Sequence, residues 1–134
     1  MMRVLTVRQP WADAIAHLGK DVENRTWSTK YRGPLAILAG RAYDAEARPE
    51  VERLAGVRLL LPLAAGTVLA LADLVDVHHA DDHTEPCSPW AQPGQFHWVL
   101  TNPRPLDRPY GLIGSLGLRI ATPDIEADIL ERAA

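Results

Sequence analysis

The sequence is poor in cysteine, and it has neither a strong excess of one charge nor an apolar segment of membrane-spanning length. Cys87 is the only cysteine among 134 residues, so no disulfide can form within the chain and nothing indicates an oxidising compartment. The first apolar stretch runs only from Val4 to Val7 before Arg8 interrupts it, which fits neither a signal peptide nor a membrane span. We therefore expect a cytoplasmic protein without a membrane partner.

The net charge is small, but it is unevenly distributed. A formal charge of −3 and a pI near 5.9 argue against a broad basic face of the kind that grips long nucleic acids. Residues 1–41 carry seven basic and three acidic residues (7 − 3 = +4), whereas the remainder carries seven and fourteen (7 − 14 = −7). This asymmetry indicates either a local cationic site on an acidic body or simply solvated surface charge.

The apolar content is sufficient for one packed domain. Hydrophobic residues make up 47% of the chain, no linker or repeat divides it, and we expect a single domain over residues 1–134. Residue patterns predict strands at Met2–Val7, Asp21–Trp27, Leu35–Ala39, Thr67–Val77, Phe96–Thr101 and Leu112–Ile120. They predict helices at Pro10–Gly19, Asp44–Ala55 and Thr122–Arg132, and loops at His78–Gln95 and Asn102–Pro109.

Local patterns refine three of these elements. The first helix has apolar residues at helical spacing, which places Trp11 in the core, and Gly19 can end it in a left-handed conformation. Alternation in the second strand places four side chains on one face: Asp21, Glu23, Arg25 and Trp27. In the second helix, Pro49 either starts a shorter helix or kinks a longer one.

Three N-terminal stretches carry a family resemblance: Arg8-Gln9-Pro10-Trp11-Ala12, Gly19 to Trp27, and Tyr31-Arg32-Gly33-Pro34-Leu35. Together they resemble the ASCH domain, a branch of the PUA-like superfamily, and the resemblance continues to Gly114–Leu118. In the family signature G-x-K-x-x-E-x-R, this chain supplies Lys20, Glu23 and Arg25, while Leu18 replaces the first Gly. The resemblance implies an α+β fold: a PUA-like β-barrel of five to six mainly antiparallel strands, with two or three short helices at its ends.

The resemblance also implies a cleft, lined by the signature, that binds RNA or a nucleotide-like small molecule. Candidate binding residues are Arg8, Gln9, Lys20, Glu23, Arg25, Trp27, Arg41 and Trp98. Arginines can hold phosphate, the helix start behind Arg8 favours anions, and a tryptophan (Trp27, Trp90 or Trp98) can stack on a base. The plainer alternative is a buried Glu23–Arg25 pair that only ties the strand to the helix.

Hydrolysis is a second hypothesis, because some ASCH relatives are ribonucleases or amidohydrolases acting on acylated cytidines. Lys20 and Glu23 are then the candidate catalytic residues. In the amidohydrolase pattern Asp73 could stand for a later acid, but Glu23 replaces a nucleophilic Thr. RNA cleavage could instead use Glu23 as the general base, with Tyr31 or His97 as the proton donor. A third hypothesis makes the polar strand an edge that binds protein partners.

Potential metal ligands gather in the loop that follows the fourth predicted strand: His78, His79, Asp81, Asp82, His83 and Cys87. Their spacing matches no standard zinc pattern, and a solvated acidic loop explains them equally well. We therefore expect no metal and no other cofactor. Cys87 also lacks a basic or helix N-terminal setting that would make it a nucleophile.

Overall fold

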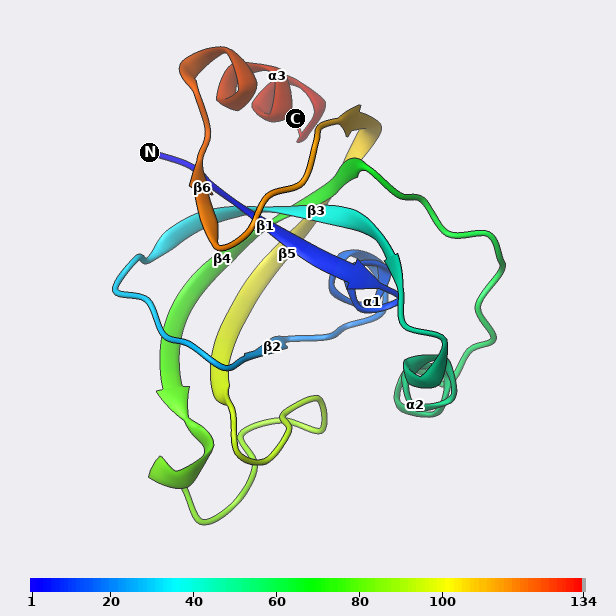
Figure 1. Cartoon of the computed structure of the whole chain (residues 1–134), viewed down its shortest axis with the longest axis vertical. Helices are drawn as coiled ribbons and strands as arrows, with labels where there is room; N and C mark the ends of the chain where they lie inside the picture. The colour runs from blue at the N-terminus through cyan, green and yellow to red at the C-terminus, as the bar shows by residue number, and fades with distance from the viewer. Residues whose placement is uncertain (134) are drawn as a thin grey trace.

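A computed structural model describes residues 1–133 and combines one mixed sheet with three α-helices (Figure 1). The strands are β1 (Arg3–Gln9), β2 (Val22–Arg25), β3 (Gly33–Tyr43), β4 (Thr67–His79), β5 (Phe96–Gly111) and β6 (Leu118–Ile120). The helices are α1 (Trp11–His17), α2 (Arg48–Ala55) and α3 (Pro123–Ala133), with short 3-10 turns η1 (Ala45–Ala47) and η2 (Ala80–Asp82). The predicted α+β class is consistent with this architecture.

The strand order in the sheet is β2-β5-β4-β3-β1-β6. Only β1 and β3 pair in parallel, and the other neighbouring pairs are antiparallel. The mainly antiparallel arrangement therefore agrees with the prediction. A closed barrel is not confirmed, because the order is linear and ends in β2 and β6.

The central strand β3 buries side chains on both faces of the sheet. Leu35 and Ile37 pack with residues of α1 on one face, whereas Ala36 and Leu38 pack with α3 on the other. All four are at most 1% exposed, which is why this segment is apolar without alternation. The prediction of a fully buried strand here is confirmed.

The segment Asn102–Pro109 is part of strand β5, so its prediction as a loop was wrong. Strand β2 pairs with β5 only from Phe96 to Val99, and beyond that point β5 has β4 as a neighbour on one side. One edge of the segment is thus free of ladder bonds, and proline is tolerated in such a strand. Register shifts between β4 and β5 absorb the irregular backbone.

Most of the predicted last strand is instead a loop. Only Leu118–Ile120 forms β6, and Gly117 before it has a left-handed φ of 69°. The Ser115 amide of this loop donates to the Thr6 hydroxyl oxygen (3.2 Å), which holds the loop beside β1. Helix α2 begins at Arg48 with Pro49 in its first turn, so the shorter form of this helix is confirmed. No helix in residues 1–133 has the length and apolarity to cross a membrane.

Candidate functional site

A cleft of about 560 Å³ opens where β1, β2 and the end of β3 meet two loops. The loops contribute residues 92–95 and 115–117. Its charged lining consists of Arg8, Lys20, Glu23, Arg25, Arg41 and Asp44. Four cations against two anions give a formal charge of 4 − 2 = +2, on a chain whose net charge is −3. Four of the seven basic residues in the N-terminal region therefore line one cavity, whereas Arg3, Lys30 and Arg32 do not.

Glu23 holds Arg25 in place at the wall of the cleft. Its Oε2 accepts a hydrogen bond from Arg25 Nε at 2.9 Å and lies 2.9 Å from Arg25 Nη2 in an ion pair. Arg25 Nη2 also donates to the Thr6 carbonyl at 2.8 Å, which connects β2 to β1 across the cavity. The two hydrogen bonds, from Nε to Glu23 and from Nη2 to the Thr6 carbonyl, fix the orientation of the planar guanidinium. The pair joins β2 to another strand, β1, and not to the helix as the plainer hypothesis expects, and it does so beside open space.

Lys20 lies at the floor of the cleft and is only 3% exposed. Its Nζ donates to the Val22 carbonyl, lies 3.8 Å from Glu23 Oε1, and sits 4.9 Å from the centroid of the Trp11 ring. Burial lowers the pKa of Lys20, while the carboxylates of Glu23 and Asp21 act in the opposite direction. Lys20 therefore supports Glu23 from below and is not the solvent-facing cation expected from the sequence.

The ionisation of Lys20 gives a test of this burial. Because the folded-state pKa of Lys20 lies below its ordinary value of 10.5, the unfolded chain binds more protons than the folded chain between these two values. The free energy of unfolding should therefore rise with pH through this window in the wild type, relative to Lys20→Met. Urea denaturation of both proteins at a series of pH values measures the difference. A difference that is constant or falls with pH contradicts a desolvated Lys20.

Arg8 and Arg41 lie at the rim of the cleft, and both are exposed. Within residues 1–133 neither forms an ion pair. Between them, Gly40 packs so closely on β1 that an added Cβ would lie 3.1 Å from Thr6 Cγ2. The absence of a side chain at Gly40 thus lets β3 lie close to β1 on this side of the cleft. The Arg41 guanidinium lies against Gly66, where an added Cβ would be 3.3 Å from Nη2.

Trp27 lines the cleft, but Trp98 does not. Trp98 is 0% exposed, its ring packs edge to face on Trp27 with centroids 4.8 Å apart, and its Nε1 donates to the Trp27 carbonyl (3.1 Å). The assignment of Trp98 as a ligand-stacking residue is therefore wrong, because it belongs to the core and supports Trp27 from behind. Trp90 is also buried, at 7% exposed. Of the two half-buried tryptophans that line the cleft, Trp11 packs over Lys20, and Trp27 is the candidate for stacking.

Gln9 is not part of the cleft, contrary to the sequence prediction. Its Nε2 donates to Asp13 Oδ1 (2.7 Å) and to the Ala64 carbonyl (2.9 Å), while its Oε1 accepts from the Asp13 amide (3.0 Å). It is 2% exposed and lines a neighbouring apolar groove formed with residues 61–65, which shares Gly40, Arg41 and Ala42 with the cleft. Gln9 therefore anchors the start of α1. In the sequence, the i to i+4 spacing of Gln9 and Asp13 is the pattern that indicates this contact.

The proton donors and the later acid considered for hydrolysis lie outside the cleft lining. Asp73 pairs with Arg104 at 3.1 Å. The Tyr31 hydroxyl donates to the Pro34 carbonyl, and burial raises the pKa of this phenol. His97 is 3% exposed and bonds the Gln92 carbonyl. Burial also raises the pKa of the Cys87 thiol, which is the opposite of what a thiolate nucleophile requires.

Several cleft residues were not found from the sequence. Asn24 lines the wall and clamps the loop beside it, since its Nδ2 donates to the Trp90 carbonyl (3.0 Å) and its Oδ1 accepts from the Gln92 amide (2.9 Å). Gln92, Gln95 and residues 115–117 complete the cavity. These residues lie at least 66 positions from Asn24 in the chain, so no local pattern marks them.

A family model describes the same region of the chain: the ASCH domain model matches residues 5–110. The chain belongs to the ASCH domain family. The match includes the signature residues Lys20, Glu23 and Arg25, which line the cleft together. The family assigned by resemblance is thus confirmed.

Solved structures support the fold of this ASCH domain. The crystal structure of ASCH from Zymomonas mobilis is 13% identical, with a TM-score of 0.62 over 99% of this chain and 96% of that one. Two mutant proteins of the same ASCH also match at 13% identity, with TM-scores of 0.63 and coverage of 99% of this chain and 99% or 96% of theirs. At this identity the likeness concerns the fold. No protein with a curated description matches the sequence.

Proposed function

We propose that the cleft binds single-stranded RNA or a nucleotide-like ligand without turning it over. In this proposal Arg25 donates hydrogen bonds to a phosphate or a base edge at the wall of the cleft. Arg8 and Arg41 bind phosphate at the rim, and Trp27 stacks on a base. Membership of the ASCH family, whose members generally bind RNA, supports this ligand class.

The observation that carries the proposal is the presentation of Arg25. Its Nε and Nη2 are occupied by Glu23 and the Thr6 carbonyl, whereas Nη1 forms no hydrogen bond within residues 1–133. The Arg25 side chain is 21% exposed and lines the cleft. A guanidinium fixed on one side with two free N–H groups on the other is suited to donate hydrogen bonds to a phosphate or carbonyl oxygen.

The size and charge of the site favour a short segment of nucleic acid. Three solvent-reachable arginines can meet only a few phosphates, and the acidic remainder of the chain offers no extended basic track. Binding without turnover is the version we favour, because the cleft lining does not include Asp73, Tyr31 or His97. Glu23 is also committed to holding Arg25 and Lys20.

Fluorescence anisotropy with a labelled single-stranded RNA tests the proposal. Three phosphate contacts predict a log–log salt slope of about −2, and Arg8→Gln or Arg41→Gln should each reduce its magnitude by about 0.7. Arg108→Gln is the matched control, since this arginine lies outside the cleft and is 66% exposed. Affinity that is insensitive to both rim variants contradicts the assignment. Incubation of the wild type with the RNA, and with N4-acetylcytidine, should yield no product, and product formation favours the hydrolase instead.

A further inference from the structure

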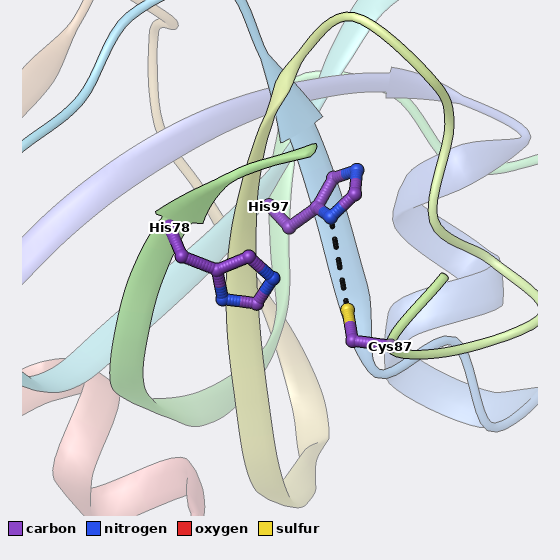
Figure 2. Close-up of side chains that lie close together, drawn as sticks. All are labelled: His78, Cys87 and His97. Atoms are coloured by element: carbon purple, nitrogen blue, oxygen red, sulfur yellow. Dashed lines mark hydrogen bonds between the residues drawn. The ribbon is translucent and has the colours of Figure 1, made fainter. Parts of the chain in front are cut away.

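A second cluster of reactive side chains lies where β4 ends and β5 begins, next to the loop that connects these two paired strands. His78 of β4 and His97 of β5 are cross-strand partners, and Cys87 reaches them from the connecting loop. Figure 2 shows the two imidazole rings and the Cys87 sulfur converging on one point. We propose that His78, Cys87 and His97 form a zinc site.

The distance between Cys87 and His97 agrees with tetrahedral zinc. The ligand atoms of the three residues all lie within 4.8 Å of one another, and His97 Nδ1 is 3.7 Å from Cys87 Sγ. With Zn–N bonds of about 2.0–2.1 Å and a Zn–S bond of about 2.3 Å, tetrahedral N and S ligands lie about 3.6 Å apart. The Cys87–His97 pair therefore has the spacing of zinc ligands, and the third ligand atom, which lies up to 4.8 Å away, has to move inward by about 1 Å to complete the set.

Hydrogen bonds outside the cluster orient both rings as ligands. His78 Nδ1 lies 2.8 Å from the Asp76 carboxylate, and His97 Nε2 lies 2.6 Å from the Gln92 carbonyl. Both partners are acceptors, so these outer nitrogens carry the hydrogens in neutral rings and the lone pairs remain on His78 Nε2 and His97 Nδ1. Metal-binding histidines are held in the same way, with the outer N–H donated to a carboxylate or carbonyl oxygen.

An unsatisfied atom points independently to a ligand. His78 Nε2 is buried and has no hydrogen-bond partner within residues 1–133. Leaving a buried polar atom unpaired is costly, and a bound cation removes that cost. One thiolate and two imidazoles form a mixed set that suits zinc rather than magnesium or calcium, and exposed Cys87 leaves the fourth position to water.

The site would stabilise one wall of the cleft. Two contacts hold the loop that carries Cys87. The Ser88 hydroxyl donates to Oδ1 of Asp21, just before β2 (2.5 Å), and His97 of β5 contacts the Gln92 carbonyl. Gln92 itself lines the cleft. Zinc should therefore slow amide hydrogen exchange in residues 83–95, whether or not the cleft binds RNA.

Titration of the metal-free protein with zinc against a chromophoric chelator measures the affinity, and cobalt(II) serves as a spectroscopic probe. The wild type should bind one equivalent, and its cobalt complex should show thiolate charge-transfer absorption. Asp76→Asn should weaken zinc binding about 10- to 100-fold, and loss of the ligand in Cys87→Ser should weaken it by more than that. Because Cys87 is exposed, this variant keeps the core intact.

His17→Ala is the control, because it removes an exposed histidine at the end of α1 and should leave the affinity unchanged. Two results overturn the proposal. One is wild-type protein that binds zinc no more tightly than Cys87→Ser. The other is a cobalt complex without thiolate absorption. Both readouts are independent of RNA affinity, so they fail or succeed separately from the cleft proposal.

Discussion

Replacing Glu23 with alanine should lower the free energy of unfolding by about 3–5 kcal/mol, as removal of one partner from a buried ion pair does. Glu23 stands between two cations, with Arg25 at 2.9 Å and Lys20 at 3.8 Å. Without the carboxylate, a buried ammonium and a mostly buried guanidinium both lose their ion-pair partner. Urea denaturation monitored by tryptophan fluorescence gives the change.

Lys20→Met provides the comparison for this prediction. Removing Lys20 leaves Glu23 still paired with Arg25, so the loss of stability should be clearly smaller than for Glu23→Ala. In the double variant the two losses should not add, because the residues share one cluster. A loss below about 1 kcal/mol in Glu23→Ala, the range of exposed surface pairs, would show that Glu23 does not hold the site together.

Arg25→Lys should reduce RNA affinity about 10- to 100-fold, since charge-assisted hydrogen bonds contribute about 1.5–3 kcal/mol each. Lysine keeps the positive charge, but one ammonium cannot pair with Glu23 and the Thr6 carbonyl while also presenting two fixed donors to the cleft. The loss should therefore appear at every salt concentration with little change of slope. Fluorescence anisotropy measures it.

Arg32→Lys is the matched control for this substitution. Arg32 is exposed, donates to the Thr29 and Tyr31 carbonyls, and lies outside the cleft lining. Its replacement should leave RNA affinity unchanged. If Arg25→Lys binds RNA as tightly as Arg32→Lys does, the fixed guanidinium is not the element that recognises the ligand, and the proposed role of Arg25 is wrong.

The signature residues were predictable as a group because they are close in sequence. Lys20, Glu23 and Arg25 lie within six positions, so a strand that follows a helix brings them to one place. Burial was less predictable. Lys20 is covered by Trp11 and Trp90, and Trp90 comes from a loop 70 residues later. Tertiary packing therefore decided which cation remains accessible to solvent.

Residues whose environment depends on distant segments were assigned wrongly. Trp98 was a stacking candidate by residue type alone, yet it is fully buried behind Trp27. The prolines of Asn102–Pro109 indicated a loop, but an unpaired strand edge accommodates them. His97 was separated from the metal-ligand cluster at His78–Cys87 because strand pairing, not sequence spacing, brings it there.

An NMR titration of the labelled protein with a short single-stranded RNA shows whether the ligand binds in the cleft beside Arg25. Saturable shifts should concentrate on the Arg25 Nε–H, the Trp27 indole and the amide of Arg8, which line the cleft but not the neighbouring groove. The groove at residues 61–65, beside Gln9, should remain unperturbed. Shifts centred on residues 61–65, or no saturable shift in the cleft, would show that the cleft beside Arg25 is not the ligand-binding site.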